Sequence, residues 1–138
     1  MDGVYNTPMN IEEKERIARR GNMGLEACAI RLAAARRVAN VSQAEVAEAA
    51  GIKKTAYSNM ETGRSFPTRP VMKFFHRLHR IDFNFLMHGD FAQLPGDVQS
   101  VIFDALIAAG DAWDQRSRSD LRQVSSRPKR MRKGSSPS

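Results

Sequence analysis

One short run of side chains could donate many hydrogen bonds from a single face of a helix. It comprises Lys53, Lys54, Thr55, Ser58 and Asn59 and contains no acidic residue. Spacings of three and four residues bring side chains together on one face of a helix. Ammonium, hydroxyl and amide groups donate to the acceptors on base edges and to phosphate oxygens. The run therefore predicts a helix that lies in the major groove of DNA.

Two short helices must position this run, and residues 43–62 have the types that such a pair needs. Ala47 is small enough for the point at which two steeply crossed helices touch, and Gly51 tolerates the positive φ of a tight turn. Apolar residues of the same stretch would hold both helices onto the rest of a domain. These residues are Val46, Ala50, Ile52, Tyr57 and Met60. Residues 43–62 are thus predicted to be a helix-turn-helix motif.

Patterns for other chemistry are weak. His76 and His79 lie three residues apart, but a zinc site needs about four ligands, and Cys28 and the distant His88 do not complete a set. The sequence has no Ser/His/Asp or Cys/His arrangement, no glycine-rich phosphate loop and no cluster of carboxylates. We therefore expect no metal ligand, no catalytic residue, no cofactor and no enzyme activity.

The net charge of +7 comes from one end of the 138-residue chain. Residues 115–138 contain eight bases and one acid, whereas residues 91–114 contain four acids and no base. A basic tail suits a polyanionic partner, although such tails are common. No apolar run reaches the roughly 20 residues of a membrane span, and no signal segment is recognisable. We expect a cytoplasmic, nucleoid-associated protein without membrane contact.

Helical patterns continue on both sides of the motif, so the expected fold class is all-α. Residues 1–23 form an N-terminal extension with a disordered lead and a short charged helix, which begins after Asn10 and stops at Gly21. Residues 24–90 form a five-helix domain, with helices expected at about 24–39, 43–50, 53–61, 68–79 and 83–87. Residues 91–116 contain a C-terminal helix that begins near 96. Residues 117–138, rich in Ser, Arg and Pro, are expected to be a disordered basic tail.

Residues 30–89 resemble the Cro- and repressor-type helix-turn-helix domain of phage repressors, the XRE family. The resemblance covers all five helices of that domain and rests on several short motifs together. The matching residues are Arg31-Leu32, Arg36-Arg37, Ser42-Gln43, Val46-Ala47, Gly51, Tyr57 to Arg64 and Phe83 to Gly89. The resemblance implies a lambda-repressor-like domain that binds double-stranded DNA as a homodimer.

The resemblance also implies roles for individual residues. Phosphate-contacting positions are occupied by Gln43, Arg64, Ser65 and Arg69. Base-contacting positions are occupied by Lys53, Lys54, Thr55 and Asn59, and Ser58 belongs to the same outward row. Arg36 and Glu61 match an ion pair that joins the first helix of the domain to the recognition helix. A charge such as Glu61, facing inward, needs a partner.

Three departures from the family pattern affect these roles. Asn40 and Arg80 stand where glycines are usual, so the loop at Arg80 is expected to be tighter or differently capped. Lys53 and Lys54 replace more neutral residues. Their charges would raise non-specific affinity and salt dependence, and would blur which of the two contacts a base.

The apolar stripe of the 96–116 helix, from Val98 to Trp113, has two interpretations. It could fold back onto the domain, or it could pair with its copy in a dimer, which would hold two recognition helices about 34 Å apart. This helix or the N-terminal helix could also meet a protein partner. The acidic outer face of the 96–116 helix could hold the basic tail when DNA is absent.

The sequence therefore favours a transcriptional regulator, most simply a repressor that binds a palindromic operator as a dimer. One alternative is an antitoxin-type regulator, which would bind both an operator and a toxin protein. The other is a protein-binding antiactivator that has lost DNA binding.

Overall fold

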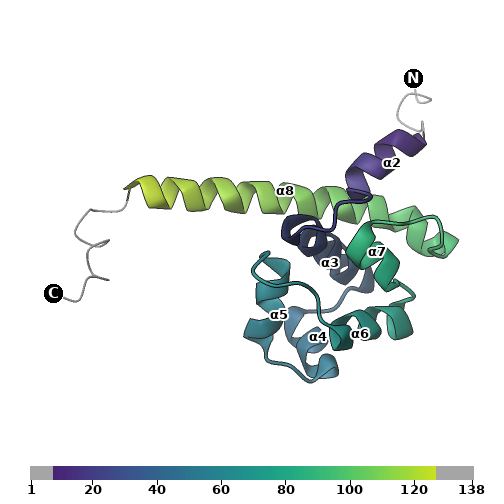
Figure 1. The fold of residues 1–138 in the computed structure, drawn as a ribbon, viewed down its shortest axis with the longest axis horizontal. Coiled ribbons are helices and arrows are strands. Elements are labelled where there is room, and N and C mark those ends of the chain that lie inside the picture. Colours follow the sequence, from purple (N-terminus) through teal and green to yellow (C-terminus); the bar gives the residue numbers. More distant parts are fainter. Residues whose placement is uncertain (1–7, 127–138) are drawn as a thin grey trace.

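The computed structural model describes residues 8–126, without the side chains of residues 123–126. Within this range the chain forms helices and no strand, which confirms the all-α prediction for these residues. The helices are α2 (Ile11–Ala18), α3 (Leu25–Ala39), α4 (Gln43–Ala50), α5 (Lys54–Glu61), α6 (Arg69–His79), α7 (Phe83–His88) and α8 (Gly96–Ser126). Figure 1 shows α3 to α7 as one group, with α8 lying along one side of it. Among the described residues, no helix combines the length and apolar character needed to cross a membrane.

Side-chain caps fix the starts of three helices. Asn10 and Glu13 form a reciprocal capping box at α2, and Ser42 and Glu45 form one at α4. In each box the side chain of the cap residue accepts from the backbone N–H three residues on, which satisfies an otherwise unpaired donor. Asp82 caps α7 by accepting from the N–H of Phe85 at 3.1 Å. These starts agree with the capping patterns in the sequence.

Left-handed residues end several helices, and not all of them are glycines. Asn40 has φ 57° at the end of α3, and Arg80 has φ 59° at the end of α6. Arg80 thus adopts the conformation of the glycine usual there, and its N–H donates to the carbonyl of His76 at 3.1 Å. The N-terminal helix ends earlier than the sequence predicts. It stops at Ala18 because Arg19 is already left-handed, with φ 52°.

The core is built around α3, which contacts α5, α6, α7 and α8. The contact between α3 and α8 is the most extensive between any two helices. Small residues occur on both helices at this junction, where Ala29 and Ala33 of α3 and Ala109 and Ala112 of α8 line one hollow. Small side chains let two helix axes approach closely. α2 packs in turn on α8 and buries Ala18.

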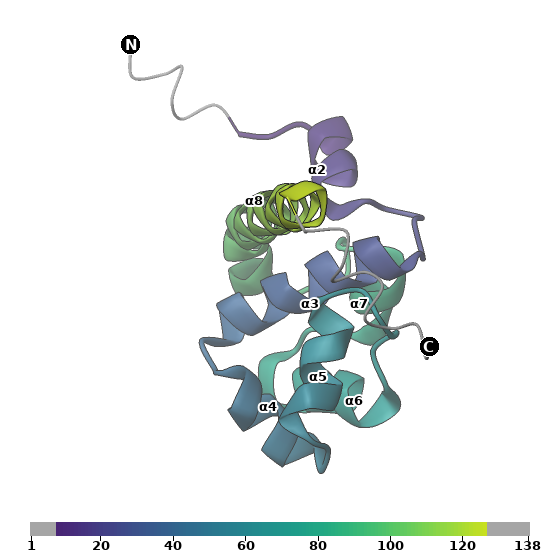
Figure 2. The same ribbon diagram turned by 90° about the vertical axis from the view of Figure 1, so that its left-hand side faces the viewer.

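The apolar stripe of α8 packs against the chain's own domain. Its members Val98, Ile102, Leu106 and Ala109 each expose 4% or less of their surface. Figure 2 shows α8 nearly end-on, next to α3. Of the two interpretations of the stripe, the structure shows the fold-back. Pairing with a second copy through the same residues would require α8 to leave α3.

α8 is longer than the sequence pattern predicts. The expected helix ends near residue 116 and disorder begins at 117, but α8 continues to Ser126, so the prediction of disorder is wrong for residues 117–126. No Gly or Pro occurs between Gly110 and Pro128, and exposed Ser and Arg are tolerated in a helix. The rest of the predicted tail, residues 127–138, lies outside the described residues, as does the lead at 1–7.

Candidate nucleic-acid interface

The turn between α4 and α5 has the small residues that a tight crossing requires. Ala47 exposes 3% of its surface, and Gly51 has φ 72°. The N–H of Gly51 donates to the carbonyl oxygens of Ala47 and Glu48 and so closes the end of α4. Lys53 is the extended residue before α5, which begins at Lys54. Lys53 therefore lies at the corner of the turn, just outside the helix.

α5 has one buried face and one exposed face. Tyr57, Met60 and Glu61 are buried and hold the helix onto the domain. The predicted outward row follows the other side of the helix. Lys53, Lys54 and Thr55 are exposed, and Ser58 and Asn59 are half-buried. The structure thus leaves all five sequence-predicted residues at least partly accessible, and together they are here called the α5 row.

Glu61 lies beneath the end of α5 and accepts hydrogen bonds from three residues. Arg36 donates from Nε to Oε2 at 2.7 Å and from Nη2 to Oε1 at 3.1 Å. Gln43 donates from Nε2 to Oε1 at 3.0 Å, and the Tyr57 hydroxyl donates to Oε2. This network joins α3, α4 and α5. It fixes the orientation of α5 and hence the direction in which the α5 row points.

The protonation states of the donors suit this network. The hydrogen bond with Glu61 raises the pKa of Arg36, with burial acting in the opposite direction. Burial, followed by the charge of Glu61, raises the pKa of Tyr57. Both side chains therefore remain protonated at neutral pH and can donate. The side chain of Glu61 exposes only 7% of its surface, so its charge is met by the protein and not by water.

Gln43 has a second partner besides the phosphate that the resemblance assigns to it. Its side chain is half-buried at the start of α4 and uses one Nε2 hydrogen for Glu61. A primary amide carries two N–H groups. Gln43 can therefore belong to the Glu61 network and still donate once to a ligand.

The loop after α5 turns back over the end of that helix. The N–H groups of Arg64 and Ser65 donate to the carbonyl of Asn59 at 2.9 and 3.3 Å. The side chains of Arg64 and Ser65 are exposed, as is Arg69, the first residue of α6. These three predicted phosphate-contacting residues are thus placed at the surface, on the chain segment that directly follows α5.

Two contributors to this region have roles that the sequence pattern did not reveal. Tyr57 is predicted only as an apolar contact, although its spacing of four residues from Glu61 is a signal for the hydrogen bond. Trp113 of α8 lies against Gly63, where an added Cβ would come within 2.6 Å of the Trp113 ring. Gly63 also has φ 78°, so the loop needs a glycine there for two reasons. α8 therefore supports the loop that follows α5.

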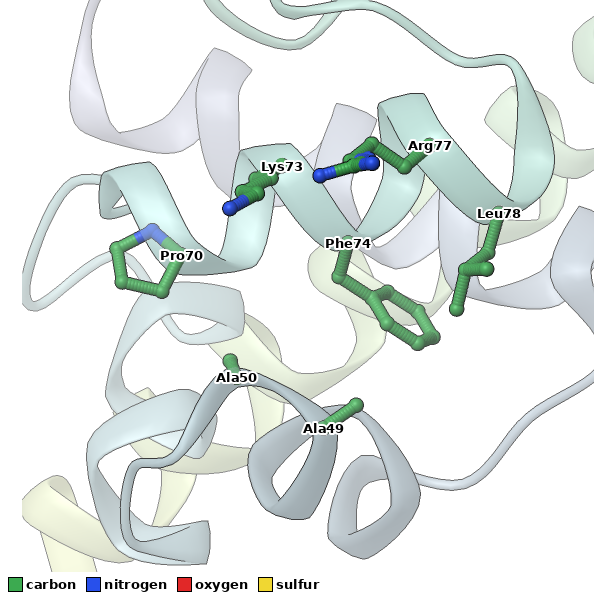
Figure 3. A pocket seen from close by; sticks show the side chains of 7 residues that line it. All are labelled: Ala49, Ala50, Pro70, Lys73, Phe74, Arg77 and Leu78. Atoms are coloured by element: carbon green, nitrogen blue, oxygen red, sulfur yellow. The ribbon is translucent and has the colours of Figure 1, made fainter.

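A groove between α4 and α6 lies beside these elements (Figure 3). It holds about 480 Å³, and its lining includes Ala50, Phe74, Lys73 and Arg77. The charged groups in the lining are two bases without an acid or a nucleophile, so they offer no pair for general acid–base catalysis. In residues 8–126 no three His, Cys, Asp or Glu side chains are placed to hold a metal ion.

Residues 28–82 match a family model described as a helix-turn-helix domain. This range runs from the first turns of α3 to the residue before α7 and contains the whole α5 row. Neither a curated protein nor a solved structure matches the chain.

Proposed function

We propose that the protein is a sequence-specific transcriptional regulator of the XRE/Cro-like type, because residues 28–82 match the helix-turn-helix family model. In this proposal it is a repressor that occupies a palindromic operator as a dimer, with α5 as the recognition helix. The family is one of DNA-binding domains whose members are typically regulators without enzyme activity.

The observation that carries the proposal is the α5 row. Its five side chains are all donors, none is acidic, and the three at the start of the row are exposed. The first residues of a recognition helix are those that contact base edges in the major groove. Amides pair best with adenine and lysines with guanine, so Asn59 would select a base pair and Lys53 and Lys54 would add charge.

Phosphate contacts would surround this row. Gln43 at the start of α4 would contact the backbone on one side, and Arg64, Ser65 and Arg69 would contact it on the other. Such contacts set the position of the recognition helix without selecting a sequence. Arg36 and Glu61 would act indirectly, since they hold α5 in place.

The proposed dimer needs a surface other than the α8 stripe, which α3 occupies. Leu78 of α6 and Phe83 of α7 expose 64% and 58% of their surfaces. A second copy packed near these residues would bury apolar area that the monomer leaves in water. Sedimentation of the protein with and without its selected DNA would measure the oligomeric state.

Selection of bound duplexes from a random pool tests the proposal directly. We expect one enriched motif with two related halves. Asn59→Ala should then weaken binding to that motif by about 1–3 kcal/mol and relax the preference at one base pair in each half. Fluorescence anisotropy on the motif and its single-base variants would measure both effects.

Asn84→Ala is a matched control, because Asn84 is an exposed asparagine on α7, outside the α5 row. It should leave the affinity and the base preference unchanged. If no motif is enriched from the pool or from the native genome, the repressor proposal fails and a protein-binding role takes its place. If Asn59→Ala leaves the ranking of sequences unaltered, α5 is not the recognition helix.

A further inference from the structure

A small hollow opens between α3, the start of α4 and α8. It holds about 140 Å³. Its polar lining includes Arg36 and Arg37 from α3, Gln43 from α4 and Arg116 from α8, together with Glu61. The hollow is thus lined by elements of the helix-turn-helix and by a helix outside the family match.

The residues that line this hollow have a net positive charge. Glu61 is its one acidic residue, and Arg36 already neutralises it through two hydrogen bonds. Arg37 and Arg116 are exposed and add two further positive charges. Asp111 and Asp114 of α8 line a different groove, which also contains Arg16 and Arg19, and Asp120, four residues after Arg116, is exposed and does not line the hollow.

Arg116 has a defined position on α8. Its guanidinium lies 5.3 Å from the centre of the Trp113 ring, within the range of a cation–π contact. Trp113 is itself held against Gly63, directly after α5. In Figure 1, α8 continues past the domain on the side where α5 lies. Arg116 therefore extends the basic surface around α5 with a side chain from the C-terminal helix.

We propose that this hollow is a phosphate site for the DNA backbone, with Arg37, Arg116 and the second N–H of Gln43 as its donors. The inference rests on the proposed function and adds α8 to the DNA interface. Guanidinium groups present several N–H donors in a planar fork that fits phosphate oxygens. A single phosphate group fits a hollow of this size, and the position next to α4 and the loop after α5 favours a phosphate of bound DNA over a free ion.

The test compares Arg116→Gln with Arg118→Gln in the full-length chain, on the duplex selected from the random pool. Each variant removes one positive charge from an exposed arginine on α8, but Arg118 is not part of the hollow. Arg116→Gln should weaken binding to all sequences several-fold and reduce the slope of log K against log salt by about 0.9. Arg118→Gln should change both quantities much less, and Arg116→Lys should restore most of the slope.

A second measurement locates the contact on the DNA. A series of duplexes carries one uncharged methylphosphonate, each at a different backbone position. Wild type should lose affinity when one particular position in each half-site is substituted. Arg116→Gln, which already lacks this contact, should lose no further affinity at that position. Equal effects of Arg116→Gln and Arg118→Gln, or the same methylphosphonate profile for wild type and Arg116→Gln, would overturn the phosphate site and leave the regulator proposal standing. Competition by inorganic phosphate alone, without a position-specific methylphosphonate effect, would show a free-anion site and would also overturn it. Wild type without affinity for any duplex would remove both proposals.

Discussion

Two arginines on α3, five residues apart, are held in opposite ways. Arg31 is fully buried and donates only to uncharged acceptors: the carbonyls of Ala18 and Leu86 are 2.9 and 3.2 Å from its Nη1 and Nε. Arg36 is partly exposed and donates to a carboxylate, that of Glu61. The first region joins the N-terminal segment to α7, whereas the second sets the orientation of α5.

The carbonyls around Arg31 lie at the ends of two helices and in the loop after α2. Its further acceptors are the carbonyls of Arg19, Asn22 and Met87. The last carbonyls of a helix lack partners within that helix and carry partial negative charge. Arg31 thus uses one positive charge to satisfy the ends of α2 and α7 together. Burial lowers the pKa of Arg31, but an arginine stays charged at neutral pH even so.

This comparison shows that a buried charge can be met either by many dipoles or by one opposite charge. When the dipoles belong to separate segments, as around Arg31, the arginine holds those segments together by hydrogen bonds. A single carboxylate makes it a positioning group for one helix. Arginine-to-methionine replacements at Arg31, Arg36 and the exposed Arg80 test this difference. Methionine keeps much of the side-chain length but has no hydrogen-bond donor.

Arg31→Met should have the largest effect on stability. It would leave several buried carbonyls without donors, each at a cost of about 1–3 kcal/mol when no water can reach it. After partial relaxation, we expect a loss of roughly 4 kcal/mol in the free energy of unfolding. Urea denaturation followed by circular dichroism would measure it. If Arg31→Met lowers the free energy of unfolding no more than the replacement of an exposed arginine does, the carbonyls must find other donors.

Arg36→Met should cost less, about 3 kcal/mol, the lower end for breaking a buried ion pair, because Gln43 and Tyr57 still donate to Glu61. Unlike the change at Arg31, this one should also reduce affinity for the selected duplex at temperatures where the variant is folded, since α5 loses an anchor. Denaturation and anisotropy on the same samples would compare the two variants. If Arg31→Met and Arg36→Met lose the same DNA affinity for a given loss of stability, the two arginines do not differ in role, and Arg36 is not a specific anchor of α5.

Arg80→Met should have the smallest effect. Arg80 pairs with Asp97 through Nη1 and Oδ1 at 3.2 Å, but both side chains are more than half exposed. Water and salt screen such pairs. The hydrogen bond with Arg80 lowers the pKa of Asp97, so any stability from the pair is present above the ordinary aspartate pKa and is lost as pH falls through the lowered one. Melting curves at neutral and acidic pH should show a small difference from wild type that vanishes in acid.

The helix starts were predictable because their signals are local. Asn10 with Glu13, and Ser42 with Glu45, lie within one turn of each other, and the sequence shows both partners at once. The accessible side of α5 was predictable for the same reason, because Lys54 and Ser58, and likewise Thr55 and Asn59, lie four residues apart. The pairing of Arg36 with Glu61 followed from the resemblance and not from spacing.

The features that escaped prediction depend on distant segments. The acceptors of Arg31 come from residues up to 56 positions away, and backbone carbonyls leave no mark in a sequence. The sequence predicts too early an end for α8, because its last turns have the composition of a tail, although they contain no residue that stops a helix. Arg116 ends the predicted helix, and that it lines the same hollow as Gln43 depends on how α8 packs on α3, which the sequence does not show.

The cover that α8 gives to α3 has a consequence for synthesis on the ribosome. The segment 28–82 leaves the ribosome before α8 does, yet the most extensive contact of α3 is the one with α8. Until α8 has emerged from the ribosome, the surface of α3 that α8 covers lacks this cover. Nascent chains at that stage expose apolar surface, which makes them targets for chaperones and prone to aggregate.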